Sequence, residues 1–197
     1  GLDHNEMRLD DNLELQPKSS AYNNDYRFTL QSSITQYLGD RHSNRTGFYI
    51  NHLGYNLDVK QTDFTENLPT NVVNENGQSE LYQFYSQSKF KLSKQLTLNA
   101  GFHMLYFDLL KEFSVEPRIA LNYQFNEKHN IALAYGLHSK IESLPIYFIK
   151  DEGIPMNKDL KLMKSNHFVF SYNTMLSDNL KISIEPYFQL LNNVPVS

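Results

Sequence analysis

The sequence predicts an all-β fold: an antiparallel meander of about eight long strands that forms part of a larger transmembrane β-barrel. Three observations predict it: apolar and polar residues alternate along extended segments, these segments are long, and short and long connections follow one another. The 197 residues are enough for one domain and too few for two of ordinary size.

Alternation with a period of two is the main signal, because strands have this period and helices do not. In the stretch 130–138, the apolar residues Ile131, Leu133 and Tyr135 share one face, while alanine, glycine and histidine occupy the other. The same period recurs along the chain. The expected strands are 26–38, 46–58, 80–93, 96–106, 115–125, 130–138, 168–176 and 180–190.

Three places fit this pattern less well. Residues 104–113 also fit a short amphipathic helix, and we favour a strand that ends near Phe107 and is followed by a loop. Pro117 and Pro186 stand within expected strands, although proline cannot donate a hydrogen bond to a ladder. We expect a β-bulge at each proline.

Strand length narrows the class of protein. Most expected strands have about 11–13 residues, whereas strands of soluble sheets usually have about 5–6. At about 3.3 Å per residue, a strand of twelve residues spans roughly 40 Å. Tilted by about 40°, it rises roughly 30 Å, which is enough to cross the apolar band of about 25 Å in an outer membrane.

The expected connections alternate in length. Short connections are expected at 39–45, 94–95, 126–129 and 177–179, and long ones at about 59–79, 108–113 and 139–163. This asymmetry is typical of outer-membrane barrels, which have short periplasmic turns and long extracellular loops. Residues 1–23 are expected to form a further loop. With the short turns in the periplasm, both chain ends lie outside, so we expect a segment from the middle of a larger barrel.

Composition excludes several classes of protein. Cysteine is absent, which excludes disulfide scaffolds, thiolate zinc sites and cysteine nucleophiles. The net charge of -4 gives no basic footprint for nucleic acid. No run of eighteen apolar residues exists, so a transmembrane helix is excluded. No motif predicts an enzyme, and the sequence predicts no catalytic residue, cofactor or metal site.

The long connection at 139–163 holds the candidate ligand-binding residues. Tyr147 and Phe148 lie in a segment expected to be outside the membrane, and exposed aromatic residues often mark a ligand surface. Alternatively, they cap the barrel mouth, pack on neighbouring loops or extend a strand. Asp151 and Glu152 follow them as further candidates, and solvated loop charges are the alternative for this pair.

Three runs of sequence carry a resemblance to a known family. They are residues 114–139 (SVEPRIALNYQFNEKHNIALAYGLHS), 157–161 (NKDLK) and 185–196 (EPYFQLLNNVPV). They resemble the barrel of TonB-dependent outer-membrane receptors, in particular the type with a carboxypeptidase-like regulatory domain. The resemblance implies a barrel of roughly 22 strands in the outer membrane of a Gram-negative bacterium, closed by a plug domain. Residues 1–197 contain neither the plug nor the TonB box.

The resemblance further implies a barrel segment of a ligand-gated, TonB-dependent nutrient importer. Its expected partners are the TonB complex through the missing plug, outer-membrane lipid and an unknown nutrient ligand. The polar row expected to line the interior or hold the plug comprises Arg118, Asn122, Gln124, Lys181, Glu185 and Gln189. As an isolated fragment, the chain is expected to self-associate through its unpaired edge strands.

Two alternatives remain open at this point. One is a complete eight-stranded outer-membrane barrel of adhesin or structural type, in which the first and eighth strands would pair. The other is a soluble β-barrel or sandwich that binds a small ligand and turns its apolar face inward.

Overall fold

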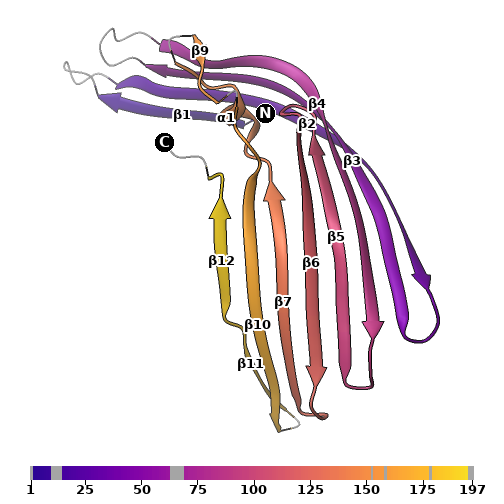
Figure 1. The fold of residues 1–197 in the computed structure, drawn as a ribbon. Helices are drawn as coiled ribbons and strands as arrows, with labels where there is room; N and C mark the ends of the chain where they lie inside the picture. Colours follow the sequence, from indigo (N-terminus) through magenta and orange to yellow (C-terminus); the bar gives the residue numbers. More distant parts are fainter. Residues whose placement is uncertain are drawn as a thin grey trace.

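The computed structural model describes residues 2–9, 15–62, 69–151, 153–157, 159–177 and 179–194. Most of these residues form one curved antiparallel sheet of order β1-β2-β3-β4-β5-β6-β7-β10-β11, in which β12 also pairs with β10 (Figure 1). Its strands are β1 (Leu2–Leu9), β2 (Leu15–Tyr37), β3 (His42–Thr62), β4 (Pro69–Lys91), β5 (Leu96–Phe107), β6 (Glu112–Gln124), β7 (His129–Lys140), β10 (Met163–Ser177), β11 (Leu180–Ile184) and β12 (Tyr187–Asn192). The connection between β7 and β10 holds helix α1 (Leu144–Tyr147) and the hairpin of β8 (Lys150–Asp151) and β9 (Ile154–Pro155).

This architecture confirms the predicted all-β meander. Each of the eight expected strands coincides with a strand of the sheet, the last one being divided into β11 and β12, and β1 is an additional strand. Residues 104–107 belong to β5, so the strand interpretation is confirmed over the helical one. No helix in the part of the chain that the structure describes is long and apolar enough to cross a membrane.

Several expected loops are strands instead, and those predictions were wrong. Residues 2–9 and 15–23 of the expected loop 1–23 lie in β1 and β2. The expected loop 59–79 is mostly β3 and β4, with residues 63–68 outside the described part. The backbone pairing of β2 with β3 continues as far as Ser19 and Gln61. Because backbone hydrogen bonds do not depend on side-chain polarity, the strands extend here without alternation of apolar and polar residues.

The connection between β5 and β6 is short, which also corrects the expected alternation of connection lengths. It consists of residues 108–111, and the turn between β4 and β5 consists of residues 92–95, so both have the same length. The side of the sheet with long connections therefore owes its length chiefly to the extended strands β2–β4 and to the β7–β10 connection. Figure 1 shows these long strands bending away beyond the ends of β5 and β6.

The two prolines cause no bulge, contrary to expectation. Pro117 stands opposite Phe102 within an unshifted register between β5 and β6. The register of β12 with β10 continues that of β11 with β10 across Pro186, and the amide of Phe170 donates to the carbonyl of Pro186 at 3.1 Å. Proline removes one hydrogen bond at each place without inserting a residue, because it lacks only the N–H.

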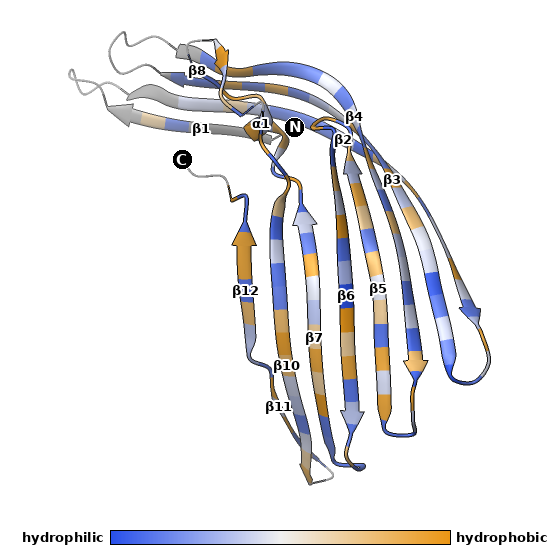
Figure 2. Cartoon of the chain, viewed as in Figure 1, coloured by the Kyte–Doolittle hydropathy of each residue, from blue (hydrophilic) through white to orange (hydrophobic). Residues whose placement is uncertain are grey.

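One face of the sheet is apolar, and the other is polar except where the β7–β10 connection packs on it. Leu30, Ile50, Tyr82, Tyr106 and Phe113 lie side by side in the register of β2 to β6. With the other apolar side chains of the same face, they form what we call the apolar band; Leu30, Tyr82 and Phe113 are exposed, and Ile50 and Tyr106 are half-buried. Alternation of apolar and polar residues is visible along single strands in Figure 2.

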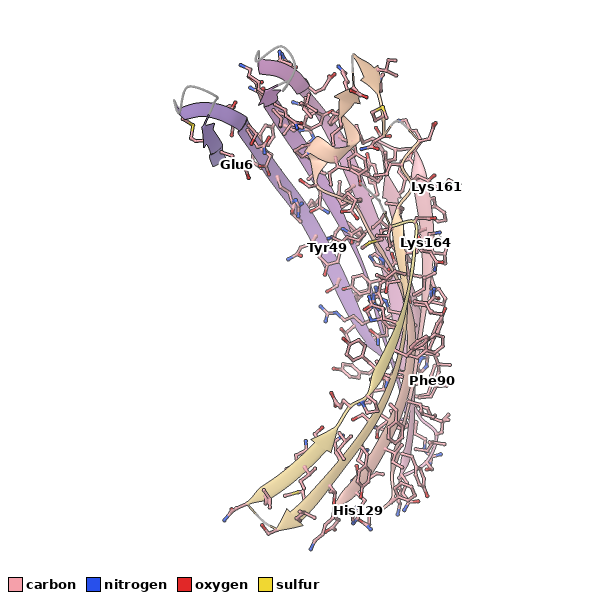
Figure 3. The ribbon with its side chains drawn as sticks, turned by 90° about the vertical axis from the view of Figure 1, so that its left-hand side faces the viewer. Glu6, Tyr49, Phe90, His129, Lys161 and Lys164 are labelled. Atoms are coloured by element: carbon pink, nitrogen blue, oxygen red, sulfur yellow. The ribbon has the colours of Figure 1, made fainter. Side chains whose placement is uncertain are left out.

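The opposite face bears Tyr49 and is the concave side of the sheet (Figure 3). The outermost strands, β1 at one edge and β11 with β12 at the other, do not pair with each other in the described residues. This argues against the complete eight-stranded barrel. The exposed apolar band likewise argues against a soluble barrel that turns its apolar face inward.

Candidate binding surface on the concave face

A hollow of about 470 Å³ lies on the concave face between β3 and β7. Its floor is formed by alternate residues of neighbouring strands, because every second side chain of a strand points to the same face of the sheet. The polar residues that line it are Arg45, Tyr49, Gln83, Tyr85, Gln87, His103, Glu116, Arg118, His138 and Ser139. Arg118 belongs to the polar row expected from the sequence, and it lines this hollow.

Glu116 is the centre of the hydrogen-bond network in the hollow. Its side chain is buried, and its Oε2 lies 2.9 Å from Nδ1 of His103 and accepts from Nη2 of Arg118 at 3.1 Å. Its Oε1 accepts from the backbone N–H of Ser139 at 3.0 Å. The other ring nitrogen of His103 lies 3.1 Å from Oε1 of Gln83. The carboxylate is therefore satisfied on both oxygens, as a buried charge requires.

Pro117 explains why this carboxylate reaches a backbone N–H. The ladder between β6 and β7 ends at Arg118, opposite Gly136, and does not continue past Pro117. Beyond that point, Glu116 bonds the backbone of Ser139, and the hydroxyls of Ser114 and Ser139 lie 2.7 Å apart. Side chains thus replace the ladder that proline interrupts.

Two histidines come together beside this network. The rings of His138 on β7 and His167 on β10 lie edge to face, with their centroids 4.9 Å apart. The described residues hold no group of three or more His, Asp or Glu side chains that could bind a metal ion. Sequence reasoning missed both the histidine pair and the pairing of His103 with Glu116. The second could have been found by folding the chain at the turn 108–111, which brings these two residues opposite each other.

The β7–β10 connection packs on the sheet beside the hollow. Tyr147 of α1 is buried, and its ring centroid lies 5.8 Å from that of Phe107. These two side chains form a core with Leu53, Leu81, Leu105 and Leu162. The hydroxyl of Tyr147 accepts a hydrogen bond from the backbone N–H of Glu142 at 2.6 Å. Burial raises the pKa of the Tyr147 phenol, because the charged form loses its hydration.

A second set of contacts holds the connection to β3 and β4. The ring of Phe148 lies 5.1 Å from that of Tyr55, whose cluster also contains Leu57 and Val73. Nζ of Lys150 donates to Oε1 of Glu75 at 2.6 Å. The connection is thus anchored by apolar contacts and by one ion pair.

The sequence-predicted candidates fall in different environments. Tyr147 and Phe148 face the sheet, where their rings lie beside those of Phe107 and Tyr55. Asp151 is exposed at the end of β8. Glu152 lies outside the described residues. The structure brings Tyr147 and Phe148 onto one packed surface and leaves Asp151 outside it.

Comparison with solved structures identifies the fold. The outer membrane transporter YddB from Escherichia coli matches with a TM-score of 0.62 at 13% sequence identity, over 87% of this chain and 26% of that one. A ferric enterobactin receptor (PfeA) G324V mutant from Pseudomonas aeruginosa matches with a TM-score of 0.66 at 12% identity, over 92% of this chain and 28% of that one. The chain therefore has the fold of a segment of an outer-membrane β-barrel, and it spans about a quarter of each of these proteins. No family model and no curated protein matches the sequence.

Proposed function

We propose that the chain is a barrel segment of a ligand-gated, TonB-dependent nutrient importer in the outer membrane of a Gram-negative bacterium. One observation carries the proposal: the sheet is open at both edges, apolar on its convex face, and polar on its concave face apart from the core that the β7–β10 connection covers. A wall of a large barrel needs this arrangement, with lipid outside and a wet or filled lumen inside. A soluble sheet would hide its apolar face.

The strand lengths agree with this assignment. β5, β6 and β7 have 12, 13 and 12 residues. Tilted as in known barrels, strands of this length rise by roughly 30 Å, which suits an apolar layer of about 25 Å. The extended parts of β2–β4 then stand outside the membrane together with the β7–β10 connection.

Residues 1–197 supply part of the barrel wall, while the plug domain and the TonB box belong to other parts of the protein. The nutrient contacts the outer side of the β7–β10 connection, where Asp151 is exposed and Glu152 follows it. Tyr147 is buried against the sheet and contacts the nutrient only if the connection leaves it, whereas Phe148 is half-buried.

Cell fractionation and uptake test the proposal. The full-length gene product is expected in the outer-membrane fraction. Growth on one limiting nutrient from a panel of ferric chelates, cobalamin, glycans and peptides should require both this gene and TonB. A periplasmic protein that is soluble without detergent would contradict the barrel assignment. Growth that needs the gene and not TonB would contradict the energy coupling alone.

A further inference from the structure

We propose that the hollow on the concave face binds a carboxylate group through the guanidinium group of Arg118. The inference rests on the proposed function only in taking the concave face as the lumen. It goes further by naming the chemistry that the lumen wall recognises.

The charges that line the hollow favour an anion. Arg45 and Arg118 are its two cationic side chains, and Glu116 is its one carboxylate among the lining residues. Glu116 is 1% exposed, and its oxygens are taken up by His103, Arg118 and the Ser139 amide. The negative charge thus lies beneath the surface with its acceptors used, whereas the positive charges face the hollow.

Arg118 is held in place with donors to spare. A guanidinium has five N–H donors in a planar fork. One of its nitrogens bonds Glu116 at 3.1 Å, and 44% of the side chain remains exposed. Arg45 also lines the hollow, but its Nη2 donates to the hydroxyl of Ser33 on β2 at 3.4 Å, on the side away from Arg118. Arg118 can therefore donate to an incoming carboxylate, whose two oxygens match the guanidinium fork.

The rest of the lining supplies neutral polar groups. The rings of Tyr49 and Tyr85 stack with centroids 5.9 Å apart, and Gln83 and Gln87 line the same hollow. Phenols and amides add hydrogen bonds without adding negative charge. Its volume of about 470 Å³ falls in the range of small-molecule sites. The carboxylate belongs either to a free small acid or to an aspartate or glutamate of a polypeptide inside the barrel.

Arginine modification tests the inference in the full-length protein in detergent. Phenylglyoxal, which modifies accessible guanidinium groups, is applied with and without glutarate, and adducts are quantified by peptide mass spectrometry. Arg27 on β2 is exposed outside the hollow and serves as the internal control. The uncharged diol 1,5-pentanediol is the matched control ligand. At a glutarate concentration about ten times the dissociation constant, modification of Arg118 should slow about tenfold while Arg27 is unaffected.

A second arm identifies a carboxylate that the protein itself supplies. Arg118 is then shielded without glutarate, and the Arg118→Lys variant should form a carbodiimide cross-link to an acidic residue other than Glu116. Either positive result supports the inference and distinguishes its source. It is overturned if Arg118 reacts as fast as Arg27 in every condition, or if Arg118 is shielded without any such cross-link. Neither result depends on nutrient uptake, so failure of the importer proposal would be seen separately.

Discussion

The ring of Tyr26 on β2 lies across Gly54, its partner in the register on β3. Its hydroxyl accepts a hydrogen bond from Nε2 of Gln78 on β4 at 3.1 Å, so one side chain connects three strands. A Cβ atom on Gly54 would overlap the ring. Tyr85 lies over Gly47 and Tyr55 over Gly77 in the same way, and each is a directly opposed pair. Tyrosine packing over a glycine restores the contacts that glycine lacks in a strand.

Substituting Gly54 should therefore destabilise the sheet by overpacking. We expect Gly54→Ala to lower the free energy of unfolding by about 1–3 kcal/mol, measured by urea denaturation of the full-length protein in detergent. Asn56→Ala, two residues along on the same face and exposed, is the matched control and should change little. The double variant Gly54→Ala with Tyr26→Ala should recover part of the loss. Purely additive effects would show that the ring is not the obstacle.

Removing the charge of Glu116 should loosen the network on the concave face. Glu116→Gln keeps the shape and weakens the hydrogen bonds to Arg118 and His103, so we expect a loss of about 1–3 kcal/mol in unfolding free energy. Glu127→Gln in the exposed turn between β6 and β7 is the control. Equal stability of the two variants would mean that the buried carboxylate contributes no net stabilisation.

Ionisation of Tyr147 should make the packing of the β7–β10 connection sensitive to alkaline pH. Burial raises the pKa of this phenol above its ordinary 10.0 in the folded protein. Above pH 10 the unfolded chain loses this proton more readily than the folded chain, so stability falls as the pH rises. Tyr147→Phe lacks this proton. The stability advantage of the wild type over the variant should be constant at neutral pH and shrink above pH 10; a constant difference throughout would refute the assignment.

The ion pair between Lys150 and Glu75 should contribute little to global stability. Both side chains are about one-third exposed, at 34% each, and exposed pairs contribute about 0.2–1 kcal/mol. A double-mutant cycle with Lys150→Ala and Glu75→Ala should give a coupling energy in that range, and this energy should shrink in high salt.

By contrast, Tyr147→Ala should increase protease cleavage within residues 141–162, because it removes a core side chain.

An isolated 1–197 polypeptide should self-associate. β1 and β12 lie at the two edges of the sheet, with backbone groups open to further pairing, and the apolar band adds an exposed face. Light scattering coupled to size-exclusion chromatography should show oligomers without detergent. A dispersed monomer at high concentration would contradict this expectation.

The sequence predicted strands well where the two faces of the sheet differ in environment. Along β5 to β7 the convex face is apolar and the concave face polar, so alternation marks the strands and their ends. The outer parts of β3 and β4 carry Asn56, Asn74 and Asn76 on one face, with the apolar Leu57 and Val73 on the other. Runs such as Asn74–Gln78 are polar enough to resemble a loop, and backbone pairing alone makes them strands.

The candidate site could be predicted only in part. Alternation in the sequence shows which residues share a face of a strand, but it does not show which residues of distant strands lie opposite each other. Arg118 was placed in a polar row from alternation alone. The pairing of His103 with Glu116 depends on the register across a short turn. The meeting of His138 and His167 depends on a register that forms across the whole β7–β10 connection, and no local pattern specifies it.

The core beneath the β7–β10 connection constrains engineering of this segment. Leu53, Leu81 and Leu105 come from three strands, and Tyr147 and Leu162 of the connection cover them. Exchanging residues 141–162 for a foreign loop would therefore expose these three leucines to solvent, unless they were redesigned together with the loop. Chimeric proteins should therefore receive the loop together with the three leucines on which it packs.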